Sequence, residues 1–418
     1  MHRPRGPHRP WSDGLPPELL RVILLNLTCL ADRVYFSAVC RPWRSAASGP
    51  DAPPRQLPWL LLPSPAAPSF FSLHSGATRR LYLPEKVRGA RLCGSHDGGW
   101  VALAFDRWRG YAAVNLLSGA RVLLPDRLRT NLPNLHGNGD CEHPMFIHTI
   151  IFSEAPSTKG CLAAAHVSSA FNIAFWRPGM DGHWVAYQHA VDVIQDMIYF
   201  KSKLKEGFHI LSNTEDVVVY TPNGGPSAPL VMSRSSYQVQ KRPDYKSDDL
   251  NLSRYLVESR GKLLMVLRQL KECRDPKGSP TFRFRIFEMN HGIAPGGGSV
   301  VSWVELHTLP GRLLLLGRGC SRAFEVSQFN RLEVGHIYYS DDTRFNISLA
   351  LKSGTDPRGD STYCPNLLLW DMWLEWEHEL RRCAYFTVDM MMPPLETNDG
   401  EEQEWDDFED YTALIKQE

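Results

Sequence analysis

The stretch from Trp59 onward most constrains the fold, because it consists of short apolar runs separated by Gly, Pro, Asn and Asp. Helical periodicity nearly disappears there, so the pattern predicts many short strands. The runs group into units of three or four strands, as at residues 99–105, 111–115 and 121–125. A unit of that size cannot bury both of its faces. Stacking such units side by side into a β-propeller buries them.

Further units recur at residues 172–187, 196–220, 255–306 and 312–339. The length from Trp59 to the chain end predicts about six blades of roughly 40–50 residues each. The units lack a repeated Trp-Asp pair, so a plain WD40 array is not expected. A pair of β-sandwiches is the alternative fold. We expect four tryptophans at corresponding blade turns to pack in the core: Trp100, Trp176, Trp184 and Trp303.

Residues 11–48 have a different pattern, which predicts three short helices. Pro16 and Pro17 suit a helix start, because a first-turn proline loses no hydrogen bond. Three helices in so few residues enclose little core, so part of their apolar surface is expected to belong to a partner. The alternative is a helical cap on the rest of the chain. The apolar positions that share one helical face are Leu19, Leu20, Ile23, Leu24 and Leu27.

This helical segment resembles an F-box. The run Leu15-Pro16-x-Glu18-Leu19-Leu20 and the later run Ala38-Val39-Cys40-Arg41-x-Trp43-Arg44 follow the F-box order near the N-terminus. The resemblance implies docking onto the Skp-type adaptor of a cullin-based ubiquitin ligase. It implies the following adaptor-binding residues: Leu15, Pro16, Leu19, Leu20, Ile23, Leu24, Leu27, Val39, Cys40 and Trp43.

The strand-rich part also carries a resemblance, on residues 58–63, 93–100, 115–125, 174–179, 255–259 and 336–342. These runs are similar to a large plant family that joins an F-box to a KIB-type (DUF295) kelch-like β-propeller. Residues 356–382, which include the Trp-rich run 370–376, depart from the usual ending of that family and leave the last blade open. The resemblance implies a substrate receptor whose target protein is unknown.

The resulting organisation has five parts. We expect a disordered basic N-terminus at 1–10, an F-box at 11–48, a Pro-rich linker at 49–58, a propeller at 59–395 and an acidic tail at 396–418. Two polar stretches, 129–144 and 222–250, are expected to be long mobile loops. Aromatic and Arg side chains often anchor interfaces, which makes the second stretch a candidate for target binding or else an insertion without a role. Its candidate residues are Arg234, Tyr237, Arg242 and Tyr245.

Composition and motifs exclude several other functions. Lys and Arg total 46 and Asp and Glu total 46, so no net charge favours nucleic acid or a lipid surface. Nine scattered cysteines without a CxxC pair favour a reducing compartment, the cytoplasm or nucleus. No apolar run approaches the ~20 residues of a membrane span. Cys141, His143 and His148 offer only three ligands, so neither a metal nor a cofactor is expected.

The sequence therefore predicts a non-catalytic receptor that holds a target near a charged ubiquitin-conjugating enzyme. Such tethering raises the effective concentration of target lysines and needs no reactive group. Two alternatives remain open. One is a scaffold that binds the adaptor but has no degradation target. The other is an enzyme, which predicts convergent polar residues with perturbed pKa values at the centre of the propeller.

Overall fold

The computed structural model of the 418-residue chain describes two structural parts, a group of helices and a group of β-sheets. The description covers residues 15–27, 30–47, 59–62, 69–72, 77–80, 90–105, 110–116, 119–134, 137–169, 171–180, 182–187, 189–201, 206–223, 230–242, 245, 252–270, 281–293, 299–328, 335–339 and 387–388. The predicted N-terminus (1–10), linker (49–58), departing segment (356–382) and tail (396–418) lie outside these residues.

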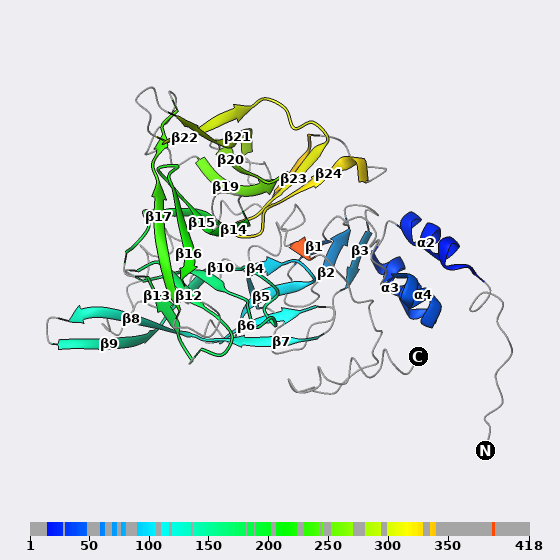
Figure 1. Cartoon of the computed structure of the whole chain (residues 1–418), viewed down its shortest axis with the longest axis horizontal. Coiled ribbons are helices and arrows are strands. Elements are labelled where there is room, and N and C mark those ends of the chain that lie inside the picture. Colours follow the sequence, from blue (N-terminus) through cyan, green and yellow to red (C-terminus); the bar gives the residue numbers. More distant parts are fainter. Residues whose placement is uncertain are drawn as a thin grey trace, which may run out of the picture.

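Three short helices lie together at one side of the molecule (Figure 1): α2 (Pro17–Asn26), α3 (Leu30–Ala38) and α4 (Arg41–Ala47). The α2 helix starts directly after Pro16, whose carbonyl accepts hydrogen bonds from the backbone N–H groups of Leu19 and Leu20 at 3.0 and 3.1 Å. Leu20, Leu24 and Phe36 are buried between the helices. The three helices predicted from the sequence are thus confirmed.

Five sheets built from β4 to β25 surround a common centre (Figure 1). The first sheet contains β4 (Arg91–His96), β5 (Trp100–Phe105), β6 (Gly110–Asn115) and β7 (Arg121–Leu124). The second contains β8 (Arg127–Asn134), β9 (Gly137–Pro144), β10 (Ile147–Phe152), β11 (Ala163–Val167), β12 (Ile173–Trp176) and β13 (Trp184–Ala186). The third contains β14 (Ile194–Lys201), β15 (Glu206–Ser212), β16 (Val217–Asn223) and β17 (Val231–Tyr237).

The remaining strands complete the ring. The fourth sheet contains β18 (Val239–Gln240), β19 (Leu252–Ser259), β20 (Lys262–Leu270), β21 (Thr281–Ile293) and β22 (Ser299–Leu306). The fifth contains β23 (Arg312–Leu316), β24 (Arg322–Glu325) and β25 (Ile337–Tyr339), with a 3₁₀ turn, η3 (Val326–Gln328). A separate sheet pairs β1 (Trp59–Leu62), β2 (Ser69–Ser72) and β3 (Ala77–Arg80) with β26 (Thr387–Val388).

The sheets form an all-β propeller of five blades, so the expected number of about six is wrong. Individual blades are larger than the length estimate assumed. The β8–β9 hairpin joins the second blade through parallel pairing of β8 with β13, and β18 joins the fourth blade parallel to β22. The side chains of the β1–β3 sheet lie outside the described residues, so no packed core assigns that sheet as a further blade.

Both stretches expected as loops contain paired strands. Residues 129–144 form most of the β8–β9 hairpin, and residues 222–250 include β17, which pairs antiparallel with β16, and β18. An outer strand gains its backbone hydrogen bonds from one neighbour and can face water with polar side chains. Because these segments are polar, the search for apolar runs did not predict them as strands.

The predicted role of the tryptophans in the core is confirmed. All four are at least 95% buried: Trp100, Trp176, Trp184 and Trp303. Two of them also link segments that are distant in sequence. The Trp184 Nε1–H donates to the Pro125 carbonyl at 2.8 Å, and the Trp303 Nε1–H donates to the Glu215 carbonyl at 2.9 Å. The indoles of Trp184 and Trp303 thus fill their blades and also satisfy their one polar atom.

Four inner strands make neighbour contacts around the centre in the order β4, β10, β14 and β19, with β24 next to β19. Side chains at the C-terminal ends of these four strands meet around one pocket, including His96, Phe152, Lys201 and Glu258. One face of the propeller is therefore built from strand ends that come from four different blades.

Candidate docking surface and central pocket

The α2 helix has one buried face and one exposed apolar face. Leu20 and Leu24 are 1% and 3% exposed, whereas Leu19, Val22 and Leu25 are 50%, 53% and 54% exposed. A helix of a small domain normally turns its apolar side inward, so three half-exposed aliphatic side chains on one helix are unusual. The arrangement leaves room for a partner on the outward face.

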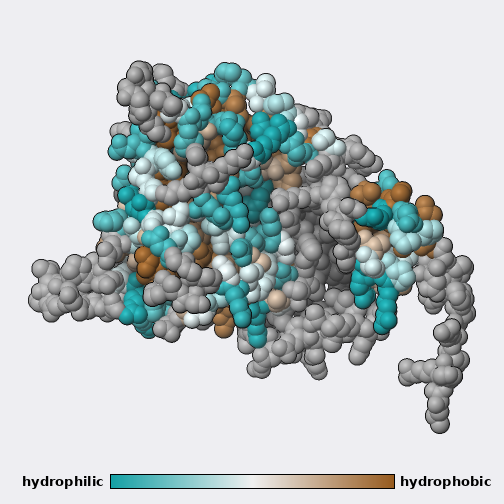
Figure 2. Space-filling model, in the orientation of Figure 1, coloured by the Kyte–Doolittle hydropathy of each residue, from teal (hydrophilic) through white to brown (hydrophobic). Residues whose placement is uncertain are grey.

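The next helix extends this apolar character. Tyr35 is 50% exposed and Val39, directly after α3, is 43% exposed. Figure 2 shows hydrophobic residues gathered over the helices at one end of the molecule. We refer to the exposed set as the helical apolar surface: Leu19, Val22, Leu25, Tyr35 and Val39.

The ten residues expected to bind the adaptor divide between this surface and the interior. Leu20 and Leu24 are buried, so they support the helices from within. A second group is half-buried and packs against that small core: Leu15, Ile23, Leu27 and Trp43. Pro16, Leu19 and Val39 are exposed and Cys40 is half-buried. Sequence reasoning missed Val22, Leu25 and Tyr35, although their helical offsets from Leu19 and Val39 could have placed them. The adaptor-binding role of the ten remains a prediction.

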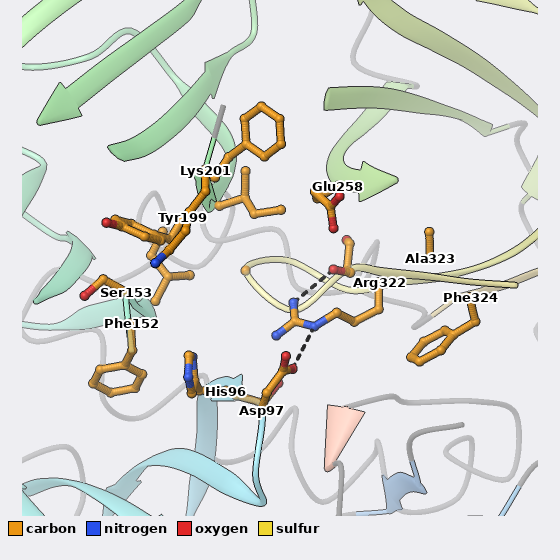
Figure 3. Close-up of a pocket in the computed structure, with 16 residues that line it drawn as sticks. His96, Asp97, Phe152, Ser153, Tyr199, Lys201, Glu258, Arg322, Ala323 and Phe324 are labelled. Carbon is orange, nitrogen blue, oxygen red and sulfur yellow. Dashed lines mark hydrogen bonds and ion pairs between the residues drawn. The ribbon is translucent and has the colours of Figure 1, made fainter. Parts of the chain in front are cut away.

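The pocket at the strand ends has a volume of about 320 Å³ (Figure 3). Its apolar walls include Phe152 from β10, Ile198 and Tyr199 from β14, and Phe324 from β24. Polar side chains enter from β4, β14, β19 and β24, and from residues next to the ends of β4, β10 and β24. The polar lining residues are Ser95, His96, Asp97, Ser153, Lys201, Glu258, Ser321 and Arg322.

Two ion pairs neutralise the cations beside the pocket. The Arg322 Nε lies 3.3 Å from Asp97 Oδ1, and the Lys201 Nζ lies 3.2 Å from Glu206 Oε1. The Tyr199 hydroxyl donates to the same Glu206 oxygen at 2.9 Å. This hydrogen bond and the Lys201 ammonium hold the pKa of Glu206 below its ordinary value. Glu206 is therefore a stable anion that fixes the positions of two pocket side chains.

Burial also affects the histidine of the pocket. It lowers the pKa of His96, against the raising effect of the Asp97 carboxylate and the further lowering effect of Arg322. At neutral pH the imidazole is therefore uncharged, and it can both donate and accept a hydrogen bond.

Beneath the pocket, the Asp196 carboxylate joins three blades. Its Oδ1 accepts from the backbone N–H groups of Met197 at 2.8 Å and Gly319 at 2.6 Å, and its Oδ2 accepts from Leu256 at 2.8 Å. Gly319 has a φ of +70°, and an added Cβ would overlap the Thr149 side chain. Only a glycine therefore lets the β23–β24 turn come this close to the carboxylate.

Burial raises the pKa of Asp196 to about 7, while the three N–H donors and Arg318 act in the opposite direction. The enzyme alternative predicted such a perturbed group among convergent polar residues at the centre. Here, however, each carboxylate oxygen already accepts at least one backbone hydrogen bond that joins blades. The shift therefore has a structural explanation, and it supplies no support for a catalytic acid or base.

Metal and membrane chemistry find no support in the described part of the chain. No three His, Cys, Asp or Glu side chains there are grouped so that they could hold a metal ion. The described helices are too short and too polar for any of them to cross a bilayer.

The candidate target-binding residues have unequal exposure. Arg242 is buried against Glu215, with Nη2–Oε1 and Nε–Oε2 distances of 2.8 and 3.0 Å, and Arg254 reaches the same carboxylate at 3.2 Å. The Tyr245 hydroxyl donates to a backbone carbonyl at 3.4 Å, and Tyr237 is half-buried. Arg234 is exposed on β17. Arg242 and Tyr245 thus have structural contacts, and the target-binding role of the four stays a prediction.

These features define a class of protein, in which a helical F-box is joined to an all-β propeller. The chain belongs to the KIB1-4 beta-propeller family, whose family model matches residues 70–363, and the F-box domain model matches residues 13–52. The resemblance of the sequence to an F-box joined to a KIB-type β-propeller is thereby confirmed.

Comparisons with individual proteins add little. A search of curated proteins found no match. Among solved structures, the WD40 domain of SCAP from fission yeast is 12% identical, over 58% of this chain and 56% of that chain, with a TM-score of 0.26. The chain thus spans just over half the length of that domain, and so loose a superposition carries no argument.

Proposed function

We propose that this chain is the substrate-recognition subunit of an SCF-type ubiquitin ligase. The observation that carries the proposal is the helical apolar surface, where aliphatic side chains such as Leu19 and Val22 stay half-exposed although α2 buries Leu20 and Leu24. Removing such apolar surface from water contributes about 25 cal/mol of binding free energy per Å². A Skp-type adaptor on this surface would gain that free energy and connect the chain to a cullin.

In this proposal the propeller holds the target, and the chain itself is not catalytic. Binding a target near the conjugating enzyme raises the effective concentration of its lysines. Such a receptor works in the cytoplasm or nucleus and needs neither nucleic acid nor a lipid surface. A scaffold without a degradation target would share the helical apolar surface. The two can be told apart by inhibiting the ligase: a protein bound to a receptor then increases in amount, whereas a protein bound to a scaffold does not.

The adaptor step is tested by a pull-down of a purified Skp-type adaptor on the immobilised full chain. Leu19→Asp combined with Val22→Asp places charge on the outward face of α2 without touching Leu20 or Leu24. The expected loss is about 2 kcal/mol or more, which is typical when anchor residues of an interface are removed. The matched control is Leu123→Asp, which changes a 68% exposed leucine on β7 of the propeller.

The control variant should bind the adaptor like the unchanged chain. Equal binding by the Leu19/Val22 variant and the control would show that this surface is not the docking site. Circular dichroism of all three proteins checks that the helices remain folded.

A further inference from the structure

The two basic side chains that line the central pocket are already engaged in ion pairs. Arg322 and Lys201 each have a carboxylate partner, Asp97 and Glu206 respectively. Two further carboxylates, Glu154 and Glu258, make no ion pair with any basic side chain in the described ranges. The Glu258 Oε1 accepts a hydrogen bond from the backbone N–H of Gly261 at 2.9 Å. Among the described residues, one carboxylate of the pocket lining and one beside it therefore lack a basic partner.

Both carboxylates act on the pocket. Glu258 lines it directly, and Figure 3 shows its carboxylate pointing toward the open centre. Glu154 follows the lining residue Ser153, and its negative charge raises the pKa of both His96 and Tyr199, which places it within electrostatic range of the lining. The nearby Arg318 affects the pKa values of Asp196, His148 and His166.

The walls between these charges suit an aliphatic chain. Phe152, Tyr199 and Phe324 supply aromatic surface, and Ile151 and Ile198 supply aliphatic surface. A lysine or arginine side chain combines a flexible apolar stem with a cationic end, and both of its parts find matching surface here. An anionic ligand would meet two carboxylates without ion-pair partners, while the cations of the lining are already engaged. Charge complementarity therefore favours a cation.

We propose that this pocket binds a lysine or arginine side chain of the target polypeptide, with Glu258 at its cationic end and Glu154 adding negative charge beside the lining. The inference rests on the proposed function, in which the propeller holds a target, and it assigns the face and the chemistry of that contact. The apolar stem lies against Phe152, Tyr199 and Phe324. The existing pairs, Arg322 with Asp97 and Lys201 with Glu206, stay intact.

The test uses the purified full chain and a randomised peptide library displayed on phage. Selected peptides are expected to share a lysine or arginine beside apolar residues, and their synthetic versions should bind more weakly as salt rises. Glu154→Gln and Glu258→Gln should each weaken binding about five-fold, as for a partly exposed charge pair. The glutamine at position 258 keeps an oxygen for the Gly261 N–H, so the turn is preserved.

The matched control is Asp192→Asn, because Asp192 is an exposed carboxylate just before β14, at the opposite end of that inner strand. It should leave peptide affinity unchanged. The proposal is overturned if no peptide is enriched, if the selected peptides lack a basic residue, or if the two glutamine variants bind like the control. All three variants should retain the adaptor in the pull-down. Failure of the unchanged chain to bind the adaptor would instead contradict the proposed function.

Discussion

Replacing Asp196 with alanine should destabilise the propeller strongly, because one carboxylate satisfies backbone N–H groups from three blades. The donors are Met197, Leu256 and Gly319, at 2.6–2.8 Å from the carboxylate oxygens. A buried donor that loses its acceptor costs about 1–3 kcal/mol. Three such donors give a loss of about 3 kcal/mol even at the lower limit.

The assay is thermal unfolding of the full chain, followed by tryptophan fluorescence. For a domain of this size, 1 kcal/mol corresponds to about 2–4 °C in Tm, so the variant should unfold roughly 6–12 °C below the unchanged chain. The control Asp192→Ala removes an exposed carboxylate of the same segment and should change stability by less than about 0.5 kcal/mol. If Asp196→Ala and the control have the same Tm, the carboxylate does not join the blades as described.

Two further predictions concern buried charges. Burial raises the pKa of Asp196 from 3.8 to about 7, so the protonated form is favoured in the folded state. The stability that this protonation contributes is fully present below about pH 4. It is lost as the pH rises to about 7. Over this range the Tm of the unchanged chain should fall relative to that of Asp196→Asn, and parallel curves would contradict the shift. Arg242→Ala leaves the buried Glu215 with fewer partners and should cost about 3 kcal/mol in unfolding free energy, whereas an unchanged Tm would leave Arg242 available as a pure target contact.

Much of the fold follows from local pattern. The alternation of short apolar runs with turn residues predicts the strands that line the centre, because a strand buried in a blade must be apolar along much of its length. The β5 strand illustrates this point: five of its six residues are buried. The β8–β9 hairpin and β17 were missed, since their pairing depends on backbone hydrogen bonds that polar side chains do not reveal.

The candidate sites depend on contacts that sequence patterns do not encode. Asp196 meets Leu256 and Gly319 across separations of 60 and 123 residues, and nothing local marks it as the residue that joins the blades. The apolar face of α2 was predicted in part. Leu19 and Leu20 were both assigned to one apolar face, yet one is half-exposed and the other buried, because neighbouring helical residues point about 100° apart.

The most direct test of the account is hydrogen–deuterium exchange of the full chain, alone and with a purified Skp-type adaptor. The account predicts slower exchange in α2 and α3, which carry Leu19, Val22, Leu25 and Tyr35, and unchanged exchange in the inner strands β10, β14 and β19. Slower exchange confined to the propeller strands, or no stable complex with the adaptor, would contradict the claim that the helices connect this receptor to its ligase.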